Sequence, residues 1–173
     1  MYIFMILFPF FVQASVDTGV MRAAFLYQFT KFITWPEVYK KRESFVICCV
    51  DDKKMEQELQ SIIEKPNHDL FHEKSIRVTG TSFADLPETL ATYPAVIVFP
   101  ENEVQKTESA IARIKESGAL LVTYGKGLCT AGAMVNFFID DGRLRFEMHR
   151  ANLEAAHFEV SAQLLRLALI VKD

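Results

Sequence analysis

Four residues that can contact a polar ligand follow apolar segments of the sequence. Asp51 and Asp52 come directly after the run FVICCV, while Tyr124 ends the run ALLVTY and Lys126 lies just beyond it. Ligands of α/β proteins bind at the carboxyl ends of parallel strands. If the two runs are neighbouring strands, these four side chains gather at one edge of the sheet. The sequence therefore predicts a small-ligand pocket there. The alternative is that the four are ordinary loop residues.

Motifs for phosphate binding, catalysis and metal binding are incomplete or missing. The segment GKG at 125–127 is similar to a phosphate-binding turn, but it lacks the glycine spacing of a Walker or dinucleotide loop. The sequence contains no G-x-S-x-G and no C-x-x-C. His68 and His72 are four residues apart, but no third ligand is near them in the sequence. We therefore expect no metal, no cofactor and no enzymatic activity.

Length and charge limit the possible classes of protein. A chain of 173 residues, half of them hydrophobic and 24% charged, is long enough to bury a core and argues against disorder. Its net charge of −3 gives no basic surface for a polyanion. Nucleic-acid binding is therefore not expected.

The N-terminus has the pattern of a secretory signal peptide. Residues 2–12, YIFMILFPFFV, form an uncharged apolar run, and Val12-Gln13-Ala14 is a small-residue cleavage pattern. This run is shorter than the ~20 apolar residues that span a bilayer. We expect residues 1–14 to be removed before Ser15, leaving 15–173 as one exported domain. An untrimmed N-terminal strand is the alternative.

The three cysteines do not determine a disulfide. Cys48 and Cys49 are adjacent in a predicted strand, where successive side chains point to opposite faces, so a bond between them is disfavoured. A bridge from Cys129 to either is one possibility, and three buried free thiols are the other.

The spacing of apolar residues predicts the elements that position these residues. An amphipathic helix begins at Met21 and ends near Thr34, because Pro36 forces its predecessor out of helical geometry. Continuous apolar runs at 45–50, 95–99 and 119–124 are typical of parallel strands covered on both faces. We also predict helices at 53–63 and 101–117, a hairpin of 133–139 with 143–148 and a helical turn at 150–156. A closing helix is predicted at 160–171, and the alternative for its last four residues, ALIV, is a strand. This order predicts an α/β fold with a mostly parallel sheet and a C-terminal antiparallel hairpin.

Aromatic side chains are the candidates for a protein interface. Aromatic residues and arginine are enriched at the centres of such interfaces. Trp35, Tyr39 and Phe71 are the predicted partner-binding anchors, while the simpler interpretation of the aromatic residues near Trp35 is that they form core.

Two blocks of the sequence resemble the YfiR-like family of bacterial periplasmic proteins. These blocks are AAFLYQFTKFITWP at 23–36 and a C-terminal set with GAMVNF at 132–137, RLRFEMHRAN at 143–152 and SAQLLRLA at 161–168. The resemblance covers nearly all of the mature chain. It implies a three-layer α/β/α sandwich, a periplasmic location and no catalysis. In that family a cysteine often precedes the strand that corresponds to 95–99 and forms a disulfide with a cysteine on the first strand. This sequence has no cysteine before 95–99, so the resemblance does not imply redox control through that disulfide.

The resemblance also implies a function. The best-described member represses an inner-membrane diguanylate cyclase by binding its sensory domain, which lowers cyclic-di-GMP and biofilm formation. We therefore expect a regulator whose partner is an inner-membrane diguanylate cyclase or sensor kinase, with an outer-membrane lipoprotein as a further partner and a homodimer as a possible state. The alternatives are a periplasmic small-ligand-binding protein and a hydrolase or transferase that uses Asp51, Asp52, His149 or His157.

Overall fold

Short apolar segments that are covered on both faces form the parallel centre of the sheet. The computed structural model describes residues 18–65, 70–71, 74–92, 94–100, 104–125 and 127–172. Every residue of β5 (Val96–Phe99) and of β6 (Leu120–Tyr124) is buried. The five parallel strands are β2 (Ser44–Val50), β4 (Lys74–Thr81), β5 (Val96–Phe99), β6 (Leu120–Tyr124) and β7 (Val135–Asp140). The predicted parallel sheet is therefore confirmed.

Antiparallel strands complete both edges of this sheet. The eight-stranded order is β10-β8-β7-β6-β5-β2-β4-β3. In this sheet β8 (Arg143–His149) runs antiparallel to β7, β3 (Leu70–Phe71) runs antiparallel to β4, and β10 (Leu169–Val171) pairs parallel with β8. The hairpin of β7 with β8 is confirmed. Asp141 and Gly142 both adopt positive φ at its turn, as a two-residue loop that follows the strand twist requires.

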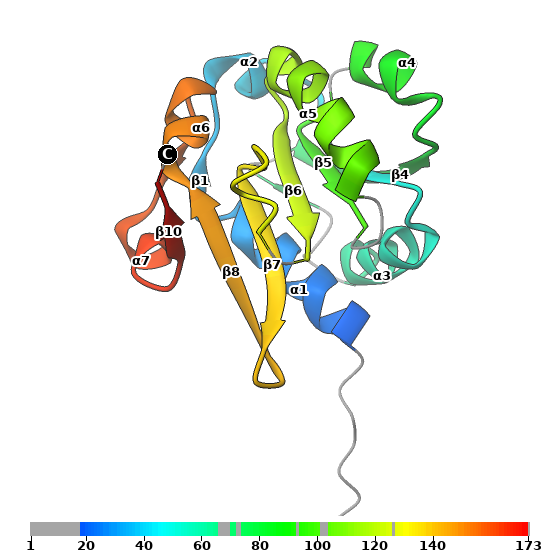
Figure 1. Ribbon diagram of the computed structural model, residues 1–173. Helices are drawn as coiled ribbons and strands as arrows, with labels where there is room; N and C mark the ends of the chain where they lie inside the picture. The colour runs from blue at the N-terminus through cyan, green and yellow to red at the C-terminus, as the bar shows by residue number, and fades with distance from the viewer. Residues whose placement is uncertain are drawn as a thin grey trace, which may run out of the picture.

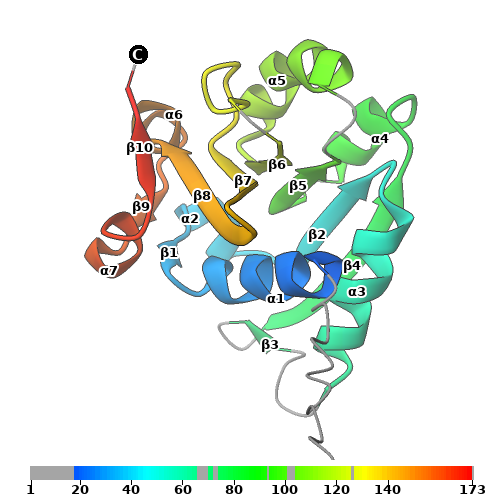
Figure 2. The same cartoon turned by 60° about the horizontal axis from the view of Figure 1, so that its bottom comes forward.

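Helices cover the two faces of the sheet (Figures 1 and 2). Figure 2 shows α1 and α3 along one face, with α4 and α5 along the other. The three-layer arrangement is confirmed. The helices are α1 (Thr18–Thr30), α2 (Glu37–Lys40), α3 (Lys53–Ile63), α4 (Leu86–Ala91), α5 (Val104–Ser117), α6 (Arg150–Ala155) and α7 (Ala162–Leu165).

Local caps fix the beginnings of two helices. The Asp52 side chain accepts a hydrogen bond from the Met55 backbone N–H at 2.9 Å, at the start of α3. Ser161 does the same for Leu164 at 3.2 Å, at the start of α7. These bonds satisfy backbone donors that have no partner inside the helix.

The predicted end of the first helix is wrong, because α1 ends at Thr30. The Trp35 indole N–H donates to the Thr30 carbonyl at 3.1 Å, which occupies an acceptor at the end of the helix. The next residues then form the short strand β1 (Ile33–Thr34), which pairs antiparallel with β9 (Glu159–Val160). A pairing partner near the other end of the chain therefore overrides the helical pattern.

The closing helix at 160–171 is also wrong in extent. Helix α7 ends at Leu165, and the final apolar residues form the edge strand β10. The alternative of a terminal strand is therefore confirmed. Parallel pairing of Leu169, Ile170 and Val171 with β8 satisfies backbone groups that a longer helix would have bonded internally.

Candidate functional site

A cavity of about 570 Å³ lies at the carboxyl ends of β2 and β4 and contains two of the predicted pocket residues. Asp51 and Asp52 line it together with Cys49, Lys53, Glu56, Gly80, Thr81, Ser82 and Asp85. The structure thus brings the two aspartates to one cavity, as strand direction predicts. Tyr124 is not in this lining. Lys126 is outside the described residues, so its part in the pocket stays a prediction.

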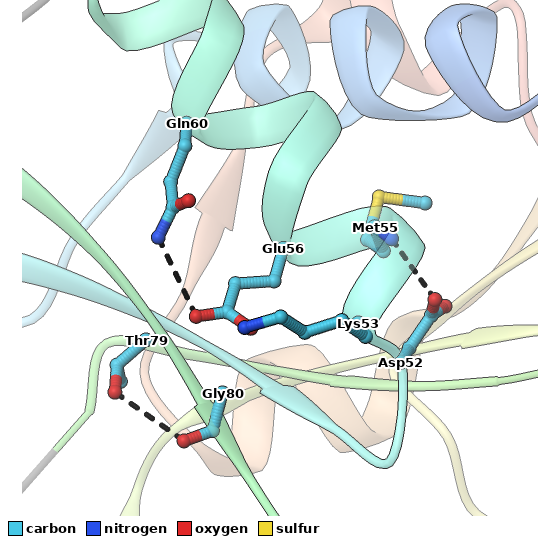
Figure 3. A network of polar contacts seen from close by, with 7 residues as sticks. All are labelled: Asp52, Lys53, Met55, Glu56, Gln60, Thr79 and Gly80. Carbon is cyan, nitrogen blue, oxygen red and sulfur yellow. Dashed lines mark hydrogen bonds and ion pairs between the residues drawn. The ribbon is translucent and has the colours of Figure 1, made fainter.

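The carboxylates of this cavity already bind groups of the protein itself (Figure 3). Asp52 caps α3, and Asp51 accepts from the Phe83 backbone N–H at 3.2 Å while holding a positive φ of 49°. Glu56 pairs with Lys53 at 3.2 Å. Gly80 lies so close to Glu56 that an added Cβ would be 2.6 Å from its Oε2 atom. These contacts give the polar residues structural roles.

Tyr124 lies in the hydrophobic core. Its side chain is 1% exposed, its ring stacks on Phe137 at 5.5 Å, and the Arg22 guanidinium lies 5.1 Å from the ring centroid. Its hydroxyl contacts the Met55 sulfur at 3.9 Å. Burial raises the pKa of Tyr124 far above its ordinary value, so the hydroxyl stays protonated.

The predicted anchors Trp35 and Tyr39 lie in an aromatic cluster with Phe45 and Phe158. Trp35 meets these three rings edge-to-face at centroid distances of 5.5, 4.7 and 5.2 Å. The Tyr39 hydroxyl donates to the Gly118 carbonyl at 2.6 Å, and burial raises the pKa of Tyr39 to about 12. Trp35 and Tyr39 are each 5% exposed. Contact with a partner is therefore limited to the edges that these rings present to a cavity.

That cavity, which we call the lysine cavity, has a volume of about 590 Å³ and was not found from the sequence. Its apolar floor is formed by Phe32, Ile33, Trp35, Tyr39 and Phe45, and its polar lining by Lys31, Thr34, Lys40, Lys74 and Ser161. None of the described residues in this lining carries a carboxylate. Lys74 and Phe45 lie near the first residues of β4 and β2, so the cavity is at the opposite end of the sheet from the predicted pocket.

The lysines of this cavity are held in place by different contacts. The Lys31 ammonium lies 4.2 Å from the centroid of the Tyr27 ring, which is a cation–π contact. Lys40 pairs with Glu37, and Lys74 donates to the Arg42 carbonyl. The arrangement combines aromatic walls with positive charge. It is chemically suited to an anion that carries an apolar group.

Sequence reasoning missed this cavity because its charged residues give no local signal. Lys31, Lys40 and Lys74 are far apart in the sequence and lie on α1, α2 and β4 or directly after them. Only the pairing of β2 with β4 and the fold of residues 31–45 bring them together.

Phe71, the third predicted anchor, lies in β3 at one edge of the sheet, where its backbone pairs with Lys74. Its side chain is outside what the structure describes. The three partner-binding residues therefore remain predictions. His68 and His72 are also outside the described residues, and the part of the chain that the structure describes contains no group of His, Cys, Asp or Glu residues arranged to hold a metal ion.

An apolar groove lies between α1 and the segment around α7. It has a volume of about 290 Å³ and is lined by Met21, Ala24, Phe25, Gln28, Phe29, Phe32, Leu164 and Leu167. We call it the α1–α7 groove. Phe32 lines both this groove and the lysine cavity, so the two hollows adjoin.

These features define a class: an α/β/α protein with hollows suited to binding. The sequence profile of the YfiR/HmsC-like family matches residues 20–169, and the chain belongs to that family. As a family, these proteins are periplasmic regulators of diguanylate cyclases rather than enzymes. The chain matches no curated protein at a significant level. No helix in the described ranges is long and apolar enough to span a membrane.

Proposed function

We propose that this protein is a periplasmic regulator that represses a membrane-bound diguanylate cyclase by direct contact with its sensory domain. The observation that carries the proposal is the family match over residues 20–169. The contacts of the carboxylates around Asp51 are consistent with it, because these side chains bind a helix start, a backbone N–H and a lysine of the protein itself.

The physical mechanism is differential binding. A regulator shifts its partner toward an inactive state only if it binds that state more tightly, because equal affinity for both states shifts nothing. The partner is an inner-membrane diguanylate cyclase, with a sensor kinase as the alternative. An outer-membrane lipoprotein that sequesters the regulator is a further proposed partner.

The first experiment measures cyclic-di-GMP in the native host. Deletion of the gene should raise cyclic-di-GMP, and complementation with the signal peptide intact should restore it. Complementation without residues 1–14 should fail, because the product would remain in the cytosol. Unchanged cyclic-di-GMP after deletion would contradict the proposed function.

The second experiment tests Trp35 and Tyr39 as anchors. Trp35→Phe and Tyr39→Phe keep aromatic packing while altering the edges in the lysine cavity. Phe158→Leu is the matched control, because Phe158 belongs to the same cluster but not to the cavity lining. Each substitution also removes one hydrogen bond, from Trp35 to Thr30 or from Tyr39 to Gly118, so binding is compared well below the melting temperature of every variant. Weaker binding to the cyclase sensory domain in the first two variants than in Phe158→Leu supports them as anchors. Equal effects in all three variants indicate a role in packing alone.

A second candidate function is binding of a small ligand, and the lysine cavity favours it. The cavity combines aromatic walls with Lys31, Lys40 and Lys74. A thermal-shift screen with nucleotides and amino acids should find an anion that stabilises the wild type and the Lys53→Gln control, but not the Lys31→Gln/Lys74→Gln variant. Stabilisation by no compound would count against this candidate.

Homodimer formation is a further proposal, and the edge strand β10 supports it. Leu169 and Ile170 are 52% and 40% exposed on a strand whose outer edge has no pairing strand among the described residues. Exposed strand edges are sites of pairing between chains. Sedimentation of the wild type against Ile170→Lys tests it, because a dimer through this edge should dissociate in the variant.

A further inference from the structure

The geometry points to the α1–α7 groove as the docking site for an acidic amphipathic helix of a protein partner. This inference rests on the proposed function, because it identifies the surface and the kind of segment through which the cyclase sensory domain would be bound. It concerns a surface different from the predicted anchors Trp35, Tyr39 and Phe71.

Three large apolar side chains of the groove are exposed. Leu167 is 68% exposed, Phe32 38% and Phe25 37%, although each is a large hydrophobic residue. Phe25 also contacts the core, with its ring 5.9 Å from Phe137 and from Phe146. The groove is therefore anchored on the rigid sheet face, which preorganises it for a partner.

Its shape fits a helix better than a strand. The α1 residues that line it recur from Met21 to Phe32 at spacings of one, three and four, which follows one face of α1 and its C-terminal end over roughly 16 Å. This length matches about three turns of a partner helix. The groove walls are side chains on helices whose backbone groups are largely bonded internally, so an extended peptide would find few backbone partners.

The charge around the groove selects the class of partner. The described lining of the groove contains no charged side chain, and the exposed cations next to it in the sequence are Lys31 and Arg166. The segments that carry the lining, residues 18–32 and 161–167, contain no carboxylate, in a chain whose net charge is −3. Each of the two cations directly precedes a groove residue in the sequence: Lys31 precedes Phe32, and Arg166 precedes Leu167. An acidic helix is complementary to this surface.

The same charges disfavour two other occupants. A second copy docked groove to groove would bring the same cations, Lys31 and Arg166, to the interface from both sides, which is repulsive. An anionic membrane surface fits the charge, but membrane-bound surfaces insert projecting apolar side chains, whereas much of this apolar surface lines a hollow. Both become outcomes of the test.

The test uses a synthetic helical peptide and the purified sensory domain of the host cyclase. The peptide has about 18 residues, with leucines at i, i+3, i+4 and i+7 and glutamates on the flanking positions. Leu167→Asp should weaken peptide binding by at least about tenfold, because it removes an apolar contact and adds repulsion. Arg166→Glu should weaken binding and reduce its salt dependence.

Matched controls separate the groove from the general surface. Val38→Asp replaces a 54% exposed apolar residue on α2, and Arg77→Glu reverses an exposed cation on β4, both outside the groove. Both controls should bind the peptide within about twofold of the wild type. Far-ultraviolet circular dichroism and the melting temperature should be unchanged in all four variants.

The outcomes distinguish the groove from the proposed function. Peptide binding that is equal in Leu167→Asp and Val38→Asp would overturn the groove. So would a Leu167→Asp variant that loses only binding to phosphatidylglycerol vesicles or only self-association. Cyclase binding that Leu167→Asp leaves unchanged would also overturn the groove, while the proposed function stands. Groove-dependent peptide binding without cyclase binding would instead contradict the proposed function.

Discussion

At the residue scale, burial decides the chemistry of the cysteines. All three are free, and each is 0% exposed. Desolvation raises the pKa of Cys48 to about 12, with a smaller contribution from Glu56, and burial raises the pKa of Cys49 and Cys129 further. Because the thiolate is the reactive form, these thiols are chemically inert in the folded protein. This outcome agrees with the alternative of buried free thiols.

We predict that these thiols make the folded state sensitive to alkaline pH. Folding raises the pKa of Cys48 from 9.0 to about 12, so its contribution to the free energy of unfolding is complete below about pH 9 and is lost as the pH rises toward 12. Urea unfolding at about pH 8 and pH 10.5 should show this decrease, with an upper limit near 1.4 kcal/mol per pH unit for each thiol. Cys48→Ala should show a smaller decrease, and an equal decrease in both proteins would contradict the assignment.

At the element scale, short local signals determine where helices begin, while long-range contacts determine where some of them end. The Asp52 and Ser161 caps are readable from sequence because a side chain and a donor three residues later suffice. The end of α1 is not readable in this way, because it depends on the pairing of β1 with β9.

We predict that the Asp52 cap contributes to stability and not to binding. Asp52→Ala should lower the free energy of unfolding by about 1 kcal/mol, because the Met55 N–H loses its acceptor. Asp52→Asn should preserve most of the stability, since asparagine caps equally well. Denaturant titration checks both values. Loss of regulation in Asp52→Asn without loss of stability would instead indicate a ligand-binding role.

At the scale of the whole molecule, the two ends of the chain form one structural unit. Phe158 packs on Trp35, the Ser161 N–H donates to the Phe32 carbonyl at 3.0 Å, and β9 pairs with β1. The N-terminal and C-terminal blocks that carry the family resemblance therefore meet in space around the lysine cavity and the α1–α7 groove.

We predict that the packing of Phe158 on Trp35 stabilises the whole domain, which unfolds as one cooperative unit. Phe158→Ala removes a ring that is 2% exposed and should lower the free energy of unfolding by about 3–5 kcal/mol. Circular dichroism and Trp35 fluorescence should report one coincident transition. Two separate transitions would indicate that the C-terminal segment detaches independently.

We also predict where the exported protein begins. The mature protein should begin at Ser15, because Val12-Gln13-Ala14 has the pattern of a signal-peptidase site. Mass spectrometry of the protein purified from the periplasm measures its N-terminus. An intact Met1 in that fraction would contradict cleavage.

The sequence by itself determined the parts of this protein that depend on neighbouring residues. Apolar runs indicated the central strands β2, β5 and β6, two further runs indicated the hairpin of β7 with β8, and the spacing of apolar residues indicated α3 and α5. These signals are local because each arises from side-chain alternation, a backbone dihedral or a hydrogen bond within a few residues.

Only the tertiary structure decided which side chains meet. It placed Asp51 and Asp52 at one cavity but Tyr124 in the core, and it turned Trp35 and Tyr39 inward. It also formed the lysine cavity and the α1–α7 groove from residues at opposite ends of the chain. The physical reason is that pairing and burial between distant segments outweigh the weak local preference of each residue, and a single sequence does not record which distant segments pair.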